Sequence, residues 1–137
     1  MGGYAAATAA PIVNPHALIL MCPGAGRWVG CTDRAEAMEA QGITKADIEG
    51  LCFPTSFNHD LYQYEPFSSA AGYTGAVLLI RGTADDLVVD ATCHRYEALY
   101  NGKCSYKTIE GANHNFESGS ARAELDRLIL EFLTPLK

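Results

Sequence analysis

One segment, residues 75–116, constrains the fold most, because it reads as strand, turn, helix and strand in succession. Residues 76–80 form an uninterrupted apolar run of strand length, bracketed by glycines. Such a run is typical of a strand covered on both faces, as in a parallel sheet. The helix that follows is predicted to begin at an Asp90 N-cap and to end just before Gly102. Residues 105–109 then predict a second, more exposed strand, so the segment indicates an α/β fold.

The loops after these two strands carry the candidate catalytic residues, Asp85 in the first loop and His114 in the second. A strand–helix–strand unit crosses over right-handed and makes its strands parallel, so both loops emerge at one edge of the sheet. Open α/β sheets build their sites at this carboxyl edge. We therefore expect Asp85 and His114 to be neighbours, although by themselves they are also ordinary turn and loop residues.

Elements on either side of this unit are predicted to extend and cover the sheet. Residues 4–10 are small and alanine-rich, which predicts a helix packed closely on a flat surface and ended by Pro11. Residues 16–22 form a further apolar strand. The apolar spacing of residues 125–133 predicts an amphipathic helix over the core. We expect a parallel sheet of about three strands flanked by helices.

Residues 27–74 differ in character, and we predict that they form a lid inserted into a core made by residues 1–26 and 75–137. The segment is too long for a simple connection and too apolar for a linker. Its aromatic side chains are candidates for substrate contact, although packing of the lid would explain them equally well. The substrate-lid candidates are Phe57, Tyr62 and Tyr64.

Two short helices are predicted within the lid, over residues 34–41 and 45–51. A pair of residues with the spacing of a capping box accompanies each of them. These pairs are Asp33 with Glu36 and Thr44 with Asp47.

The charge balance argues against a nucleic-acid partner. The chain of 137 residues has a formal net charge of −6 and a pI near 5.1, and it contains no Lys/Arg cluster. Its longest apolar stretch is too short to span a bilayer, and no basic-then-apolar signal peptide opens the sequence. We therefore predict a cytoplasmic protein with no membrane partner.

The cysteines and glycines indicate neither a metal nor a cofactor. Five cysteines are scattered, with no C-x-x-C pair and no Cys/His spacing of a zinc site, which predicts reduced, buried thiols. Gly24 and Gly26 resemble the start of a dinucleotide fingerprint, but the third glycine would fall at Val29. No cofactor is expected.

Together these pieces resemble the carboxyl-terminal half of an α/β-hydrolase, and the resemblance covers essentially the whole chain. Residues 78–88 are similar to the family's acid turn, in which a glycine precedes the triad aspartate by three residues. Residues 111–116 are similar to its histidine loop. The resemblance implies that Asp85, rather than Asp86, is the acid of a catalytic triad and that His114 is its base.

Some positions depart from the family pattern. Arg81 stands where a histidine is frequent, and Ala76 and Val89 stand where proline is common. None of these departures removes a catalytic group. The lid sequence at residues 60–66 resembles small feruloyl or cinnamoyl esterases most, with dienelactone hydrolases and prolyl peptidases as further relatives.

The opening residues resemble those that follow the nucleophile in the family's G-x-S-x-G motif. In that pattern the serine stands immediately before Met1, and Gly2 is the final glycine. The backbone N–H of Met1 would then be an oxyanion-hole donor. No serine or cysteine of the chain has equivalent surroundings, and Cys52 comes nearest. The resemblance thus implies the acid and base of a triad without its nucleophile, and a chain that is almost inactive alone.

The leading hypothesis is that the chain is part of a serine hydrolase. Once the upstream half completes it, this hydrolase would act on a small-molecule carboxylic ester. A catalytically inactive remnant that serves as a binding or dimerisation module is an alternative, as is a fragment of a peptidase of the same fold. Residues 17–22 are expected to leave one apolar sheet edge unpaired, through which a homodimer could form.

Overall fold

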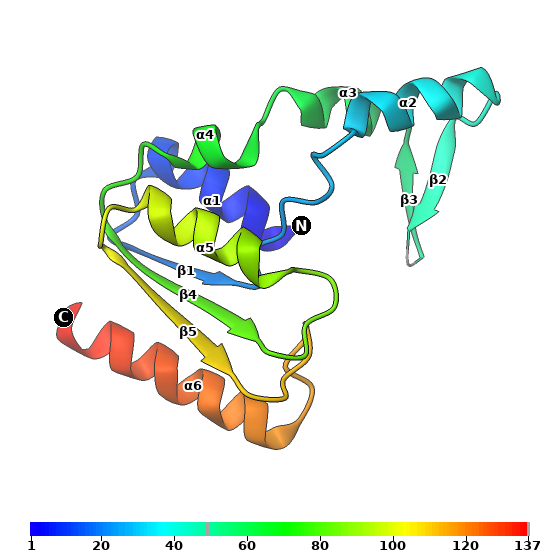
Figure 1. Cartoon of the computed structure of the whole chain (residues 1–137). Helices are drawn as coiled ribbons and strands as arrows, with labels where there is room; N and C mark the ends of the chain where they lie inside the picture. Colours follow the sequence, from blue (N-terminus) through cyan, green and yellow to red (C-terminus); the bar gives the residue numbers. More distant parts are fainter. Residues whose placement is uncertain (49, 137) are drawn as a thin grey trace. The chain divides into compact units, whose positions relative to one another are not determined.

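The computed structural model describes residues 1–48 and 50–136 (Figure 1). The chain divides into two compact units. The first unit combines Met1–Gly24 with Phe67–Lys137, and the second is Ala25–Pro66. Within the described residues, no helix is both long enough and apolar enough to cross a membrane.

The first unit is built on a parallel three-stranded sheet in the order β1–β4–β5. Strand β1 (Ala17–Met21) pairs with β4 (Ala76–Gly82), which pairs on its other side with β5 (Cys104–Ile109). The middle of β4 is almost completely buried, as its continuous apolar run predicted. The predicted α/β class and parallel sheet are confirmed. Among the described residues, no strand pairs with the outer edge of β1.

Helices cover both faces of this sheet. Figure 1 shows α1 (Gly2–Val13) and α5 (Asp90–Leu99) on one face and α6 (Gly119–Leu133) on the other. Each helix turns small or apolar residues inward, as burial of an amphipathic stripe requires. A short helix α4 (Pro66–Ala70) precedes β4, and a 3₁₀ turn (Thr134–Leu136) follows α6.

Helix α1 continues through Pro11, so the prediction that this proline ends the helix is wrong. Proline removes one backbone donor, but in the last turn of a helix this loss is local. The helix ends instead at Asn14, which adopts a left-handed conformation with φ 49° and donates its N–H to the carbonyl of Ala10 at 2.8 Å. This is the usual way of ending a helix with a short polar residue.

The start of α1 lies against the chain that leaves β1. A Cβ placed on Gly3 would lie 2.9 Å from the Cα of Pro23 and 3.2 Å from the carbonyl oxygen of Met21. A Cβ placed on Gly2 would have no other atom within 4 Å. Close backbone approach at this turn is therefore a property of Gly3 alone.

Helix α5 has a different N-cap from the predicted one. The cap position is Val89, in extended conformation and without a side-chain hydrogen bond, and Asp90 is the first helical residue. The Asp90 carboxylate instead accepts a hydrogen bond from the hydroxyl of Tyr106 on β5 at 2.6 Å. At the other end two residues are left-handed, Asn101 with φ 48° and Gly102 with φ 78°.

The second unit contains α2 (Cys31–Ala40), the antiparallel strands β2 (Lys45–Ile48) and β3 (Leu51–Pro54), and α3 (Ser56–Tyr62). The predicted lid, residues 27–74, extends beyond this unit, and its action as a lid stays a prediction.

The predicted helix over residues 45–51 is wrong, because the described residues on either side of residue 49 belong to two antiparallel strands and their turn. Gly50 takes φ 81° and donates its N–H to the Asp47 carboxylate at 3.0 Å, so Asp47 stabilises a turn and caps no helix. The other predicted helix is present as α2, but it starts at the N-cap Gly30, and Asp33 lies in its first turn.

Candidate active site

The turn after β4 holds Asp85 in a fixed position. One carboxylate oxygen of Asp85, Oδ1, accepts hydrogen bonds from the backbone N–H groups of Leu87 and Val88, each at 2.9 Å. The buried Arg81 guanidinium spans the same turn, donating to the carbonyls of Val88 at 2.7 Å and Asp85 at 2.9 Å. Hydrogen bonds therefore link the residues of the turn to one another and to Arg81, near the end of the central strand.

The loop after β5 is attached to this acid turn through its backbone. The N–H of Ala84 donates to the carbonyl of Ala112 at 3.0 Å, and the N–H of Gly111 donates to the hydroxyl of Thr83 at 2.8 Å. A Cβ on Gly82 would lie 2.1 Å from the Ala112 carbonyl oxygen, so only glycine permits this approach. The two loops thus form one connected structure at the carboxyl edge.

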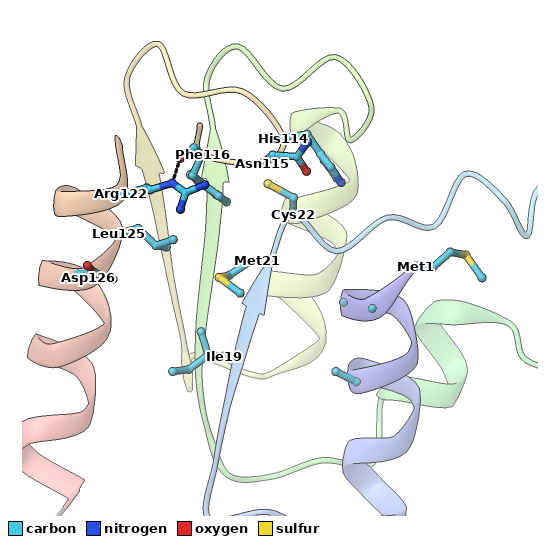
Figure 2. Close-up of a pocket in the computed structure, with 13 residues that line it drawn as sticks. Met1, Ile19, Met21, Cys22, His114, Asn115, Phe116, Arg122, Leu125 and Asp126 are labelled. Atoms are coloured by element: carbon cyan, nitrogen blue, oxygen red, sulfur yellow. Dashed lines mark hydrogen bonds between the residues drawn. The ribbon is translucent and has the colours of Figure 1, made fainter. Parts of the chain in front are cut away.

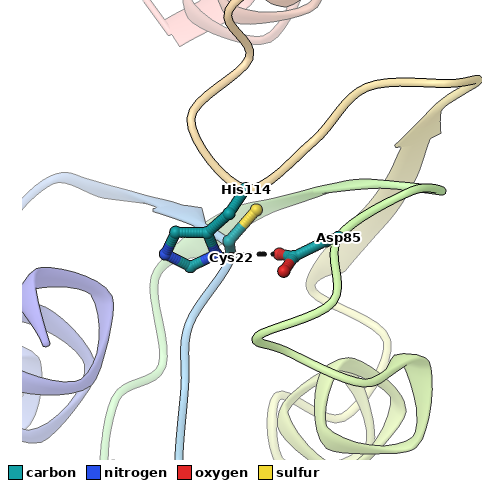
Figure 3. A group of neighbouring side chains, drawn as sticks. All are labelled: Cys22, Asp85 and His114. Carbon is teal, nitrogen blue, oxygen red and sulfur yellow. Dashed lines mark hydrogen bonds and ion pairs between the residues drawn. The ribbon is translucent and has the colours of Figure 1, made fainter.

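This attachment places the His114 ring against Asp85, as the strand–helix–strand pattern led us to expect. Nδ1 of His114 lies 2.9 Å from Oδ2 of Asp85 (Figure 3). Asp85 is only 5% exposed, and the His114 side chain is 29% exposed. With Nδ1 engaged by a carboxylate, the proton lies on Nδ1 and Nε2 is left as the basic nitrogen.

Asp85 remains ionised at neutral pH. Burial raises the pKa of this carboxyl, but hydrogen bonds from the Cys22 thiol, the Val88 N–H, the His114 ring and the Leu87 N–H outweigh burial and hold the pKa at about 2. The site therefore presents a buried carboxylate with a histidine oriented by it.

Cys22 is a member of the site that the sequence did not reveal. It follows β1, has φ 44°, is 5% exposed and hydrogen-bonds to Asp85. Burial and the contact with Asp85 raise the pKa of this thiol to about 12. The protonated, buried thiol is a poor nucleophile. Its position at the end of an apolar strand, before Pro23, was the one available signal.

A cavity of about 730 Å³ opens beside the outer edge of β1. Figure 2 shows Met1, at the start of α1, and Arg122, on α6, on opposite sides of Met21 and Cys22. The predicted oxyanion donor Met1 and the predicted base His114 both line this cavity. Cys22 is the only serine or cysteine among its described lining residues.

The three substrate-lid candidates lie in the second unit. Phe57 packs on Phe53, with ring centroids 4.8 Å apart. Tyr62 stacks on Trp28, with ring planes 6° apart, while Tyr64 is exposed. Contact of these rings with a substrate stays a prediction.

No protein-family model matches the sequence, and no curated protein matches it. Solved structures do match the fold. Est1E from Butyrivibrio proteoclasticus superposes with a TM-score of 0.76 at 19% identity, over 98% of this chain and 57% of Est1E. Est1E with bound ferulic acid gives a TM-score of 0.71 at 18% identity, over 96% of this chain and 56% of that one.

Two further structures match in the same way. E-2-(acetamidomethylene)succinate hydrolase has a TM-score of 0.61 at 16% identity, over 97% of this chain and 63% of that one. The peroxisomal alpha-beta-hydrolase Lpx1 from Saccharomyces cerevisiae has a TM-score of 0.57 at 10% identity, over 98% of this chain and 50% of Lpx1. The protein therefore has a partial α/β-hydrolase fold. It spans between half and two thirds of the length of these structures.

Proposed function

We propose that Asp85 and His114 are the acid and the base of a serine hydrolase that cleaves carboxylic esters. The observation that carries this proposal is the 2.9 Å hydrogen bond between His114 Nδ1 and an Asp85 carboxylate that backbone donors hold in place. An aspartate that fixes the tautomer of a histidine is the acid–base half of a Ser–His–Asp triad.

In the proposed reaction, His114 takes the proton of the serine hydroxyl through Nε2 as the serine oxygen attacks the ester carbonyl. The resulting imidazolium is stabilised by Asp85, whose depressed pKa keeps it a carboxylate throughout. His114 then returns the proton to the departing alcohol. A water activated by the same nitrogen hydrolyses the acyl-enzyme.

The proposed nucleophile is a serine of the complete hydrolase that these 137 residues do not contain. Two observations support this. The chain covers 57% of Est1E, and the nearest thiol, Cys22, is buried and protonated at neutral pH. Met1 precedes α1 and lines the same cavity as His114. With the serine preceding it in the complete hydrolase, Met1 would carry a backbone N–H at the positive end of the helix dipole, which suits an oxyanion-hole donor.

The proposed substrate is a small ester with an aromatic acyl group. The ferulic acid bound to Est1E motivates this choice, since Est1E has the same fold. Phe57, Tyr62 and Tyr64 are the candidates for contact with the acyl ring. Faster hydrolysis of an aryl-acrylate methyl ester than of the matching amide would support an esterase, whereas preference for the amide would favour a peptidase.

Labelling by a fluorophosphonate tests the proposed triad. The full-length product of the gene is expected to be labelled at a serine, and His114→Ala should abolish the labelling. His94→Ala is the matched control, because His94 is exposed on α5, where it contacts Asp90, Glu97 and the ring of Tyr106. A full-length protein that resists the label, or labels equally well without His114, would overturn the proposal and favour an inactive binding module.

A further inference from the structure

Three side chains from three separate elements converge at the carboxyl edge of the sheet. Cys22 follows β1, Asp85 follows β4 and His114 follows β5 (Figure 3). Their ligand atoms, one thiol sulfur, one carboxylate oxygen and one ring nitrogen, all lie within 4.8 Å of one another. Among the described residues this is the one such group of three.

We propose that this Cys22–Asp85–His114 cluster binds a divalent transition-metal ion, with Zn²⁺ as the preferred ion. Sulfur, imidazole nitrogen and carboxylate oxygen are the donors that Zn²⁺ takes in proteins. The thiol discriminates against Mg²⁺ and Ca²⁺, which prefer oxygen ligands alone. Three protein ligands leave a fourth tetrahedral position for water.

Coordination requires the ligand atoms to move by up to roughly 1.2 Å relative to one another. Tetrahedral Zn²⁺ with ligand distances of 2.0–2.3 Å needs ligand atoms roughly 3.3–3.6 Å apart. The His114–Asp85 pair at 2.9 Å would widen by a few tenths of an ångström, and the cluster as a whole, at up to 4.8 Å, would contract. The second Asp85 oxygen keeps its bonds to Leu87 and Val88, which would orient the ligating oxygen.

Access to the cluster is one-sided. Cys22 and Asp85 are each 5% exposed, whereas the His114 side chain is 29% exposed and borders the cavity. An ion would enter from this cavity, which Cys22 lines as well as His114. Coordination releases the thiol proton to the buffer, while the imidazole keeps one N–H on its other nitrogen.

Binding would occupy the acid and the base at once. Given the proposed function, Zn²⁺ would therefore inhibit the hydrolase. Metal binding itself needs no nucleophile, so the 137-residue chain can be tested directly. A chain that binds Zn²⁺ while the full-length protein resists the fluorophosphonate would support the metal site and refute only the hydrolase.

The test is a Zn²⁺ titration of the reduced chain against a chromophoric chelator, with Co²⁺ as a spectroscopic probe. We expect one equivalent of Zn²⁺ per chain and a thiolate-to-Co²⁺ charge-transfer band. Cys22→Ser and His114→Ala should each weaken Zn²⁺ binding at least about 10-fold, the lower end of what even outer-shell partners contribute. Cys52→Ser, at an exposed cysteine, should change neither signal.

Two results would overturn the proposal. One is a Zn²⁺ affinity that Cys22→Ser and Cys22→Ala leave unchanged, and the other is a Co²⁺ complex without the thiolate band. Far-UV circular dichroism of each variant establishes that it is folded. A Cys22→Ser chain that loses the metal while keeping its fold supports the site.

Discussion

Replacement of Asp85 by asparagine is expected to destabilise the first unit strongly. Asparagine keeps an oxygen that can accept from the Leu87 and Val88 N–H groups. However, it removes the charge, and its amide donor would face the Nδ1–H of His114. The variant therefore approximates wild-type protein whose Asp85 is protonated.

The magnitude follows from the pKa of Asp85. Its pKa falls from 3.8 to about 2 on folding, and each unit corresponds to about 1.4 kcal/mol. The ionised form thus contributes roughly 2–3 kcal/mol to the free energy of unfolding at neutral pH. Because the folded-state pKa is depressed, this contribution is complete above the unfolded value of 3.8 and disappears as the pH falls through about 2.

Urea denaturation followed by far-UV circular dichroism measures this effect. With an m-value of about 2 kcal/mol/M, Asp85→Asn should lower the midpoint by about 1 M at pH 7. Near pH 3 the difference from wild type should shrink to about half. Asp86→Asn is the control, because Asp86 is the exposed neighbour in the same turn. Equal shifts for the two variants, or a difference that stays constant down to pH 3, would refute this account of the site.

Three further substitutions test the packing around the site. Gly82→Ala should unfold the histidine loop and lower the melting temperature by several degrees, because its Cβ would overlap backbone, whereas Gly119→Ala, with open space, should not. Gly3→Ala should cost about 1–3 kcal/mol in urea denaturation, and a loss no larger than that of Gly2→Ala would contradict the observed contact. Leu20→Ala, at a fully buried position of β1, should cost about 2–5 kcal/mol; a loss below 1 kcal/mol would exclude it from the core.

The sheet and the contact between Asp85 and His114 were predictable because their signals are local. An apolar run between glycines can hardly be anything except the central strand β4. The right-handed crossover then leaves little choice about where Asp85 and His114 meet. Because the crossover has a fixed hand, a strand–helix–strand pattern can predict a contact between two residues that are distant in the chain.

The β-hairpin and Cys22 were not predictable in this way. The spacing of Thr44 and Asp47 fits a capping box, and it equally fits an Asp side chain that accepts from the N–H of Gly50 in a turn. Whether a helix or a turn forms depends on the left-handed conformation of Gly50. The spacing of a capping box carries no information about that conformation. Cys22 joins the site through Asp85 and His114, which lie in the loops after β4 and β5, so no window of sequence around Cys22 contains the signal.

The strand register explains why the Asp85–His114 pair is complete within these residues. Gly82 on β4 lies opposite Ile109 on β5, so the two strands end at the same level. The Thr83 N–H donates to the Ile109 carbonyl at 3.0 Å directly beyond this pair, which continues the connection into the loops. The backbone bonds that hold Asp85 and attach the His114 loop thus lie within the ends of β4 and β5 and the loops that follow them. The pair should form whether or not a nucleophile is present, so its stability and the proposed binding of Zn²⁺ can be tested independently of catalysis.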